Sequence, residues 1–448
     1  MSFIIPKPSI STSMPRFTFP AYSSHTLRNG IRVFIIPDTS QDVAGISVCA
    51  RYGAIHDTTD GVVGLMMSLL TKGTATKTAT DIATAIDAMG TTFRIASGWE
   101  SSRVSCTMLT EYFEPALRLM GDCILNASFA DDEFERQRKQ AISDHSFDLS
   151  DPGLRASCAF IDTMFAGHTY SHYRTGTVQS LQSLRREECI AAYEQYRSNS
   201  EWYIIVTGNV ETNHAVQVLD DVFGLLPKSD FVQGRADAPQ QRNGMASAFA
   251  HNDSSSQSVL MIGQRTIHPS HPDYAGVLLL NTMFGGYFLS RINTILREEK
   301  GYTYGAGSYI DTQRSKGCMI VTSASVGEQY TAESIGIILN EWKRLATEQV
   351  SDWELTRSST YVTGTFARSI ETPQQLAALF RDAYELGVTP DYHESILRQI
   401  AGMTPQALRR IQESHITPGN LVVAASGNRD ILKPILLSYG NATEVIPA

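Results

Sequence analysis

Several motifs that would assign a chemistry are missing from this sequence. It contains no CxxC pair, no glycine-rich phosphate loop and no GxSxG nucleophile motif. These absences argue against a zinc ribbon or thiol redox site, a P-loop nucleotide site and an α/β-hydrolase site. The six cysteines are dispersed along 448 residues, which favours reduced thiols in the core over a disulfide framework.

Long apolar runs and excess positive charge are missing as well. No stretch approaches the ~20 apolar residues of a membrane-spanning helix. Residues 1–17 include Pro6 and Pro8 and have no signal-peptide core. Lys and Arg number 37 against 46 Asp and Glu, so the net charge of −9 disfavours phosphate binding. We therefore expect a cytoplasmic protein with no membrane span and no nucleic-acid partner.

The chain contains an internal repeat. A buried-strand pattern that ends in Gly-Asn occurs at 200–210 and again at 418–429. An apolar helix pattern that ends at glycine, a common helix stop, occurs at 62–73 and again at 274–286. Both patterns recur after nearly half the chain length. This spacing predicts two homologous halves more readily than unrelated apolar segments.

The segment 226–247 separates the two halves. It is rich in Pro, Gly, Gln and Asp and lacks hydrophobic periodicity, so we predict a linker between an N-terminal domain, 1–225, and a C-terminal domain, 248–448. Strand patterns precede long amphipathic helices within each half. This order predicts an α+β fold, with helices on one face of a mixed or antiparallel sheet.

The segment 60–90 resembles the signature region of the pitrilysin and insulinase metallopeptidases, the inverzincins, in their bacterial branch similar to the mitochondrial processing peptidase. Lys72, Gly73 and Thr74 match the turn that follows the family's signature helix. The resemblance extends over residues 25–435. It implies that each half is a duplicated α+β unit and that two halves close like a clamshell around a peptide.

In that family, an HxxEH helix supplies two zinc ligands and the general base, and a later glutamate completes the site. The matching positions here are Gly64, Met67 and Ser68, and the third-ligand position falls at Asp144. A lone carboxylate does not hold zinc against water. The resemblance therefore implies no zinc in this chain and a zinc-bearing homologous subunit as its partner.

The segment 285–310 resembles the family's C-terminal segment. Within it, Arg297 and Tyr304 match an arginine–tyrosine pair. The resemblance implies that this pair contacts the backbone of an extended peptide substrate and stabilises the oxyanion of hydrolysis, in trans to the partner's zinc. Arg94 and Ile95 replace the Asn-Ala pair of the family's substrate-binding strand, which argues against peptide processing by this half alone.

Together, these features predict the non-zinc subunit of a heteromeric metallopeptidase, which is inactive alone. A homodimer that uses the same surfaces is an alternative assembly. The alternative function is an inert pseudo-peptidase that acts as a scaffold or only binds peptide. In that case Arg297 would belong to a solvated helix face and Tyr304 would be an ordinary strand aromatic.

The histidines offer a weaker basis for a metal site. His168 and His172 are four residues apart and would share one face of a helix, but their Gly and Thr-Tyr neighbours predict a loop. His268 and His271 flank Pro269 and have no ligand spacing to acidic residues, so we predict turn residues. The sequence therefore predicts no metal ion in this chain.

Overall fold

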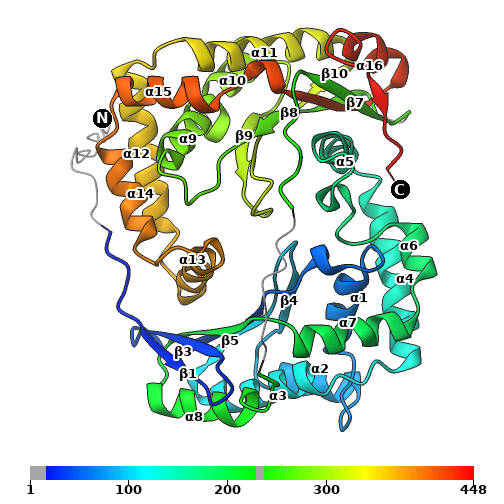
Figure 1. Ribbon diagram of the computed structural model, residues 1–448, viewed down its shortest axis with the longest axis vertical. Coiled ribbons are helices and arrows are strands. Elements are labelled where there is room, and N and C mark those ends of the chain that lie inside the picture. The colour runs from blue at the N-terminus through cyan, green and yellow to red at the C-terminus, as the bar shows by residue number, and fades with distance from the viewer. Residues whose placement is uncertain (1–16, 229–236, 254, 448) are drawn as a thin grey trace, which may run out of the picture.

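The computed structural model describes residues 17–228, 237–253 and 255–447. The N-terminal segment with no predicted signal-peptide core lies outside the described residues, apart from its last residue, and so does the middle of the predicted linker. No helix of the described residues is both long enough and apolar enough to cross a bilayer. Figure 1 shows two α+β halves, one at the bottom of the view and one at the top.

The first half is built on a six-stranded mixed sheet with the order β1-β2-β6-β3-β5-β4. The strands are β1 (Ser23–Thr26), β2 (Arg32–Pro37), β3 (Val43–Ala50), β4 (Arg94–Ser97), β5 (Ser102–Leu109) and β6 (Trp202–Gly208). β2 and β6 run parallel, and the other neighbours are antiparallel. β6 is buried along its whole length, as expected for a strand that is covered on both faces.

The second half repeats this topology in a six-stranded sheet with the order β12-β7-β11-β8-β10-β9. The strands are β7 (Ala246–His251), β8 (Gln257–Arg265), β9 (Ala306–Asp311), β10 (Met319–Gly327), β11 (Val422–Gly427) and β12 (Thr443–Glu444). β2, β6, β3, β5 and β4 correspond in order and direction to β7, β11, β8, β10 and β9. The predicted duplication is confirmed, and its unit is one sheet per half.

Helices cover one face of each sheet and form the two main cores with it. In the first half these are α1 (Val62–Leu69), α2 (Ala79–Ala88), α3 (Phe113–Leu125), α4 (Asp131–Asp148), α6 (Val178–Ser183), α7 (Arg186–Ser198) and α8 (Thr212–Phe223). In the second half they are α9 (Tyr274–Asn281), α10 (Arg291–Asn293), α11 (Thr331–Thr347), α12 (Asp352–Arg368), α14 (Tyr392–Ala401), α15 (Pro405–His415) and α16 (Arg429–Leu436). This is the predicted helix layer.

The other face of each sheet is covered by one helix from the opposite half. α5 (Pro152–Met164) packs against β7, β8 and β11, and α13 (Pro373–Leu386) packs against β3 and β6. Figure 1 shows α5 below the upper sheet and α13 above the lower sheet. Phe160 of α5 is 1% exposed, and the Phe380 ring of α13 lies 4.7 Å from the Phe34 ring of β2. The linear boundary at 226–247 therefore does not separate two independently packed cores.

We expect Phe160→Ala to lower the free energy of unfolding by about 3–5 kcal/mol, because the ring fills the core between α5 and the sheet of the opposite half. Phe147→Ala is the matched control, since this ring is 77% exposed, and it should change stability by less than about 0.5 kcal/mol. Urea denaturation followed by circular dichroism measures both. Equal losses in the two variants would contradict the packing role of the exchanged helix.

Candidate functional site

The helix with the predicted degenerate zinc motif, α1, is packed as a structural helix. Met67 is 1% exposed in the core. The Ser68 hydroxyl donates to the Leu65 carbonyl of the same helix at 2.7 Å, and Gly64 has no side chain. Zinc sites use imidazole, thiolate or carboxylate ligands. The three positions offer none of these groups. The residues of α1 therefore cannot provide the zinc ligands that the pitrilysin and insulinase metallopeptidases have on this helix.

The N-terminus of α1 is held by Asp57. Its carboxylate accepts hydrogen bonds from the Gly61 and Val63 amides, each at 2.9 Å. Burial raises the pKa of Asp57 to about 6, although these two bonds act to lower it. The first amides of the helix therefore have a partner, as helix N-termini require. Asp57 thus has a capping role that needs no metal.

On α4, the residue that faces the interior is one position beyond the predicted third-ligand position. Asp144 is exposed, and its carboxylate accepts a hydrogen bond from the Gln140 amide of the same helix at 2.6 Å. The next residue, His145, is buried, and its ring lies edge-on to Tyr173 at 5.7 Å. A carboxylate at 144 therefore points to solvent, and the buried side chain at this level of α4 is an imidazole.

Arg297 and Tyr304 lie on either side of the loop that leads into β9. Arg297 belongs to a π-helical turn, Thr294–Glu299, a rare element that is frequent at functional sites. Its Nε lies 3.3 Å from Glu298, its guanidinium lies 4.5 Å from the Phe288 ring, and its side chain is 38% exposed. Tyr304 is 93% exposed, and its hydroxyl has no hydrogen bond to the described part of the chain. Both side chains keep donors for a ligand.

The glycine pair before this segment allows a close contact between helix and strand. Gly285 belongs to a π-helical segment, Thr282–Gly286, that lies directly on β9, and a Cβ at this position would be 2.5 Å from the Ser308 amide nitrogen. The Asn293 side chain provides a second contact with β9, because its Oδ1 accepts a hydrogen bond from the Ala306 amide at 3.0 Å. The segment that carries Arg297 is therefore fastened to the edge strand that Tyr304 precedes.

Both sheets end in an edge strand near a shared cavity. Among the described residues, β4 pairs with β5 alone and β9 with β10 alone, so each has one unpaired side. Arg94 is exposed and Ile95 is half-buried on β4. A cavity of about 700 Å³ is lined by Ser97 from this strand and by Tyr274 and Phe366 from the second half. An open strand edge beside a cavity can accept an extended peptide.

His168 and His172 have different partners and do not face one another across a helix. The ring nitrogens of His168 contact the Asp237 carbonyl at 2.7 Å and the Tyr170 amide at 3.1 Å. His172 instead lies 3.2 Å from Asp60. The residues between the two histidines form a short 3₁₀ turn, not an α-helix that would place both rings on one face.

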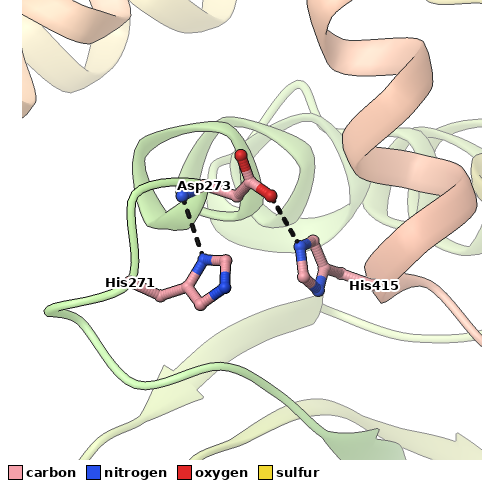
Figure 2. A group of neighbouring side chains, drawn as sticks. All are labelled: His271, Asp273 and His415. Atoms are coloured by element: carbon pink, nitrogen blue, oxygen red, sulfur yellow. Dashed lines mark hydrogen bonds and ion pairs between the residues drawn. The ribbon is translucent and has the colours of Figure 1, made fainter.

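The structure brings together three other groups that the sequence did not connect. His271 and Asp273 precede α9, and His415 is the last residue of α15. Their candidate ligand atoms all lie within 4.8 Å of one another, and no other such group occurs in the described part of the chain (Figure 2). His271 does lie in a turn, as predicted. The prediction that His271 has no acidic residue at ligand spacing is wrong, because Asp273 lies two residues further on and shares this group with it. Nothing local connects the two residues with His415.

Comparison with known families places both halves in one group. Residues 32–151 match the model described as insulinase (peptidase family M16), and residues 183–360 match the model described as the peptidase M16 inactive domain. The chain is 25% identical over 336 residues to an uncharacterized zinc protease of Mycobacterium leprae, covering 73% of this chain and 74% of the relative. A Bacillus subtilis protein with the same description is 21% identical over 352 residues, covering 78% and 84%.

Solved structures share the fold at low sequence identity. The peptidase M16 inactive domain from Pseudomonas fluorescens has a TM-score of 0.83 and 19% identity, covering 91% of this chain and 98% of that one. A protease from Helicobacter pylori has a TM-score of 0.82 and 16% identity, covering 92% and 100%. A chain of complex III2 from Candida albicans has a TM-score of 0.78 and 14% identity, covering 93% and 99%.

The raised pKa of Asp57 predicts a pH-dependent stability. Because its pKa is about 6 in the folded protein and 3.8 is its ordinary value, the folded state holds this proton more tightly. The free energy of unfolding should therefore fall as pH rises from about 4 to about 6. We expect Asp57→Asn to remove this part of the pH dependence and Asp148→Asn, at an exposed position, to keep it. Thermal unfolding at several pH values measures both, and parallel profiles for wild type and Asp57→Asn would refute it.

Proposed function

The chain belongs to the insulinase family of peptidases, M16, and we propose that it is the non-zinc subunit of a heteromeric metallopeptidase. One contrast carries this proposal. α1 offers no zinc donor at Gly64, Met67 or Ser68, whereas Arg297 and Tyr304 keep exposed hydrogen-bond donors. In this role the pair acts in trans, and a homologous subunit provides the zinc and the general base.

The two side chains suit stabilisation of an oxyanion. A guanidinium stays charged at all relevant pH values and presents several donors in fixed directions, and the tyrosine hydroxyl adds one donor. The contacts of Arg297 with Glu298 and Phe288 restrain its position and leave it partly exposed. Donors held in place before the reaction lower the barrier most, because they need no reorganisation as charge develops. Zinc in the partner supplies the activated water.

The proposed substrate is an extended peptide. The unpaired side of β4 provides backbone donors and acceptors for strand addition, which binds peptides with little dependence on their sequence. The neighbouring cavity then accepts side chains. We propose a cytoplasmic location for the complex, and a homodimer through the same surfaces is the alternative assembly.

We expect Arg297→Ala and Tyr304→Phe each to lower kcat/KM of the complex between this chain and its zinc-bearing partner by about 10²-fold, because each removes a donor to the oxyanion. Tyr302→Phe is the matched control. Its hydroxyl lies on the same loop but donates to Glu333 at 2.7 Å, so activity should stay within about twofold. Hydrolysis of internally quenched peptides by the purified complex measures all three.

An inert scaffold is the second candidate function. The fold it shares with a chain of complex III2 from Candida albicans and the inactive-domain description of the second family model favour this reading. The same variants separate the two functions. If the partner's turnover requires this chain but is unchanged by Arg297→Ala and Tyr304→Phe, the scaffold function holds and the site-completing function is wrong.

The purified chain alone should hydrolyse none of these peptides, with or without added zinc, because α1 has no ligand set for the ion and no general base. The same peptide assay, run before and after addition of the partner, tests this expectation. Light scattering of the isolated chain reports whether it forms a homodimer. Peptidase activity of the isolated chain that a chelator abolishes would overturn the proposal.

A further inference from the structure

We propose that His271, Asp273 and His415 form a binding site for a divalent transition-metal ion in the second half. His271 and Asp273 lie in the turn between β8 and α9, and His415 ends α15. The site is separate from α1 and from the Arg297–Tyr304 pair, and its proposed role is structural.

The three side chains converge on one point. His415 Nε2 already lies 2.9 Å from Asp273 Oδ2, and the His271 and His415 rings are 5.2 Å apart at an angle of 79°. Figure 2 shows the two rings on either side of the space below the carboxylate. Zinc bonds to nitrogen and oxygen are about 2.0–2.2 Å long, so donor atoms within 4.8 Å of one another close around an ion after small side-chain movements. The position of His271 in a surface turn permits this movement.

The ligand types select the metal. Two imidazoles and one carboxylate suit zinc, cobalt, nickel or copper, whereas magnesium and calcium prefer sets made of oxygen atoms. Three protein ligands leave at least one position for water. The side chains of Asp273 and His415 are 26% and 15% exposed, so the ion can enter from solvent.

Two existing hydrogen bonds must be exchanged when the ion binds. The proton between His415 Nε2 and Asp273 Oδ2, which lie 2.9 Å apart, must leave Nε2 before both atoms can bind the ion. His271 Nδ1 accepts from the Asp273 amide at 3.1 Å, which places the ring proton of the neutral imidazole on Nε2. When His271 binds the ion through Nε2, its ring proton moves to Nδ1. The Asp273 amide then donates its hydrogen bond to water instead of to Nδ1. These exchanges weaken the site without preventing binding, because Asp273 and His415 are partly exposed and water can replace the lost partners.

The positive charge of Arg410 weakens the binding of a cation at this site, so a substitution of Arg410 tests whether the site binds an ion. Its guanidinium lies 3.8 Å from Asp273 Oδ1, and its side chain is 75% exposed. A cation at the carboxylate is repelled by this charge. If the three residues only cap α9 and any metal binds elsewhere on the chain, the Arg410→Ala substitution leaves the metal affinity unchanged. If they hold an ion, loss of Arg410 strengthens binding.

A bound ion would link two helices that already pack together, α9 and α15. α9 continues into the π-helical segment Thr282–Gly286, which contacts β9. An ion that binds the folded state stabilises it by mass action. A bound ion would therefore stabilise the packing of α9, the helix that precedes the segment with Arg297.

The test is a cobalt titration of the full chain after chelator treatment, followed by the visible absorption of the bound ion and by displacement with zinc. We expect one ion per chain. His271→Ala, His415→Ala and Asp273→Asn should each weaken binding by about tenfold or more, and Arg410→Ala should strengthen it. Circular dichroism and thermal unfolding without metal establish that each variant is folded. If His415→Ala does not fold, the cobalt affinity of His271→Ala decides the test.

The matched control is His172→Ala, which removes an exposed histidine next to Asp60 that belongs to no group of three candidate ligands among the described residues. Its cobalt affinity should equal that of wild type. The proposal is overturned by the absence of saturable binding, by equal losses in His172→Ala and His271→Ala, or by weaker binding in Arg410→Ala. Because the readout is metal binding, failure here leaves the proposed peptidase function unaffected, and loss of that function leaves this site unaffected.

Discussion

The arrangement of the whole molecule depends on the need to bury both faces of each sheet. The central strands β6 and β11 are buried along their whole length, so each must be covered on two sides. The helices of each half cover one face only. The second face is covered by α5 or α13 from the opposite half, which fixes the two sheets relative to each other. The positions of the cavity and of the edge strands β4 and β9 follow from this exchange.

The duplication places one topology in two chemical settings. α1 and α9 occupy equivalent positions after β3 and β8, and both are apolar helices that pack into a core. α1 begins at amides bound by the Asp57 carboxylate, and α9 begins beside the carboxylate of Asp273. At both N-termini the helix amides favour a charged carboxylate, although burial outweighs this effect at Asp57 and raises its pKa. Only at α9 do two histidines lie close enough to that carboxylate to share an ion with it.

Local patterns in the sequence predicted the repeat, and tertiary contacts decided the rest. The Gly-Asn strand ends at 208 and 427 are visible in sequence because strand and turn signals span only a few residues. The helix exchange was not predictable, because α5 and α13 have the same apolar pattern whichever sheet they cover. The solvent-facing orientation of Asp144 depends on a helical phase that spacing alone does not fix. His415 joins His271 only through the packing of α15 on α9.

The exchange of helices also determines the order in which the protein can be completed during synthesis. When β6 leaves the ribosome, the first sheet has all of its strands, but Phe34, Ile36 and Ile205 on its second face still lack their cover. That cover is α13, which is translated only near the end of the chain. A nascent first half therefore displays an apolar surface throughout translation of most of the second half. Such a surface is a binding site for molecular chaperones and a risk for aggregation.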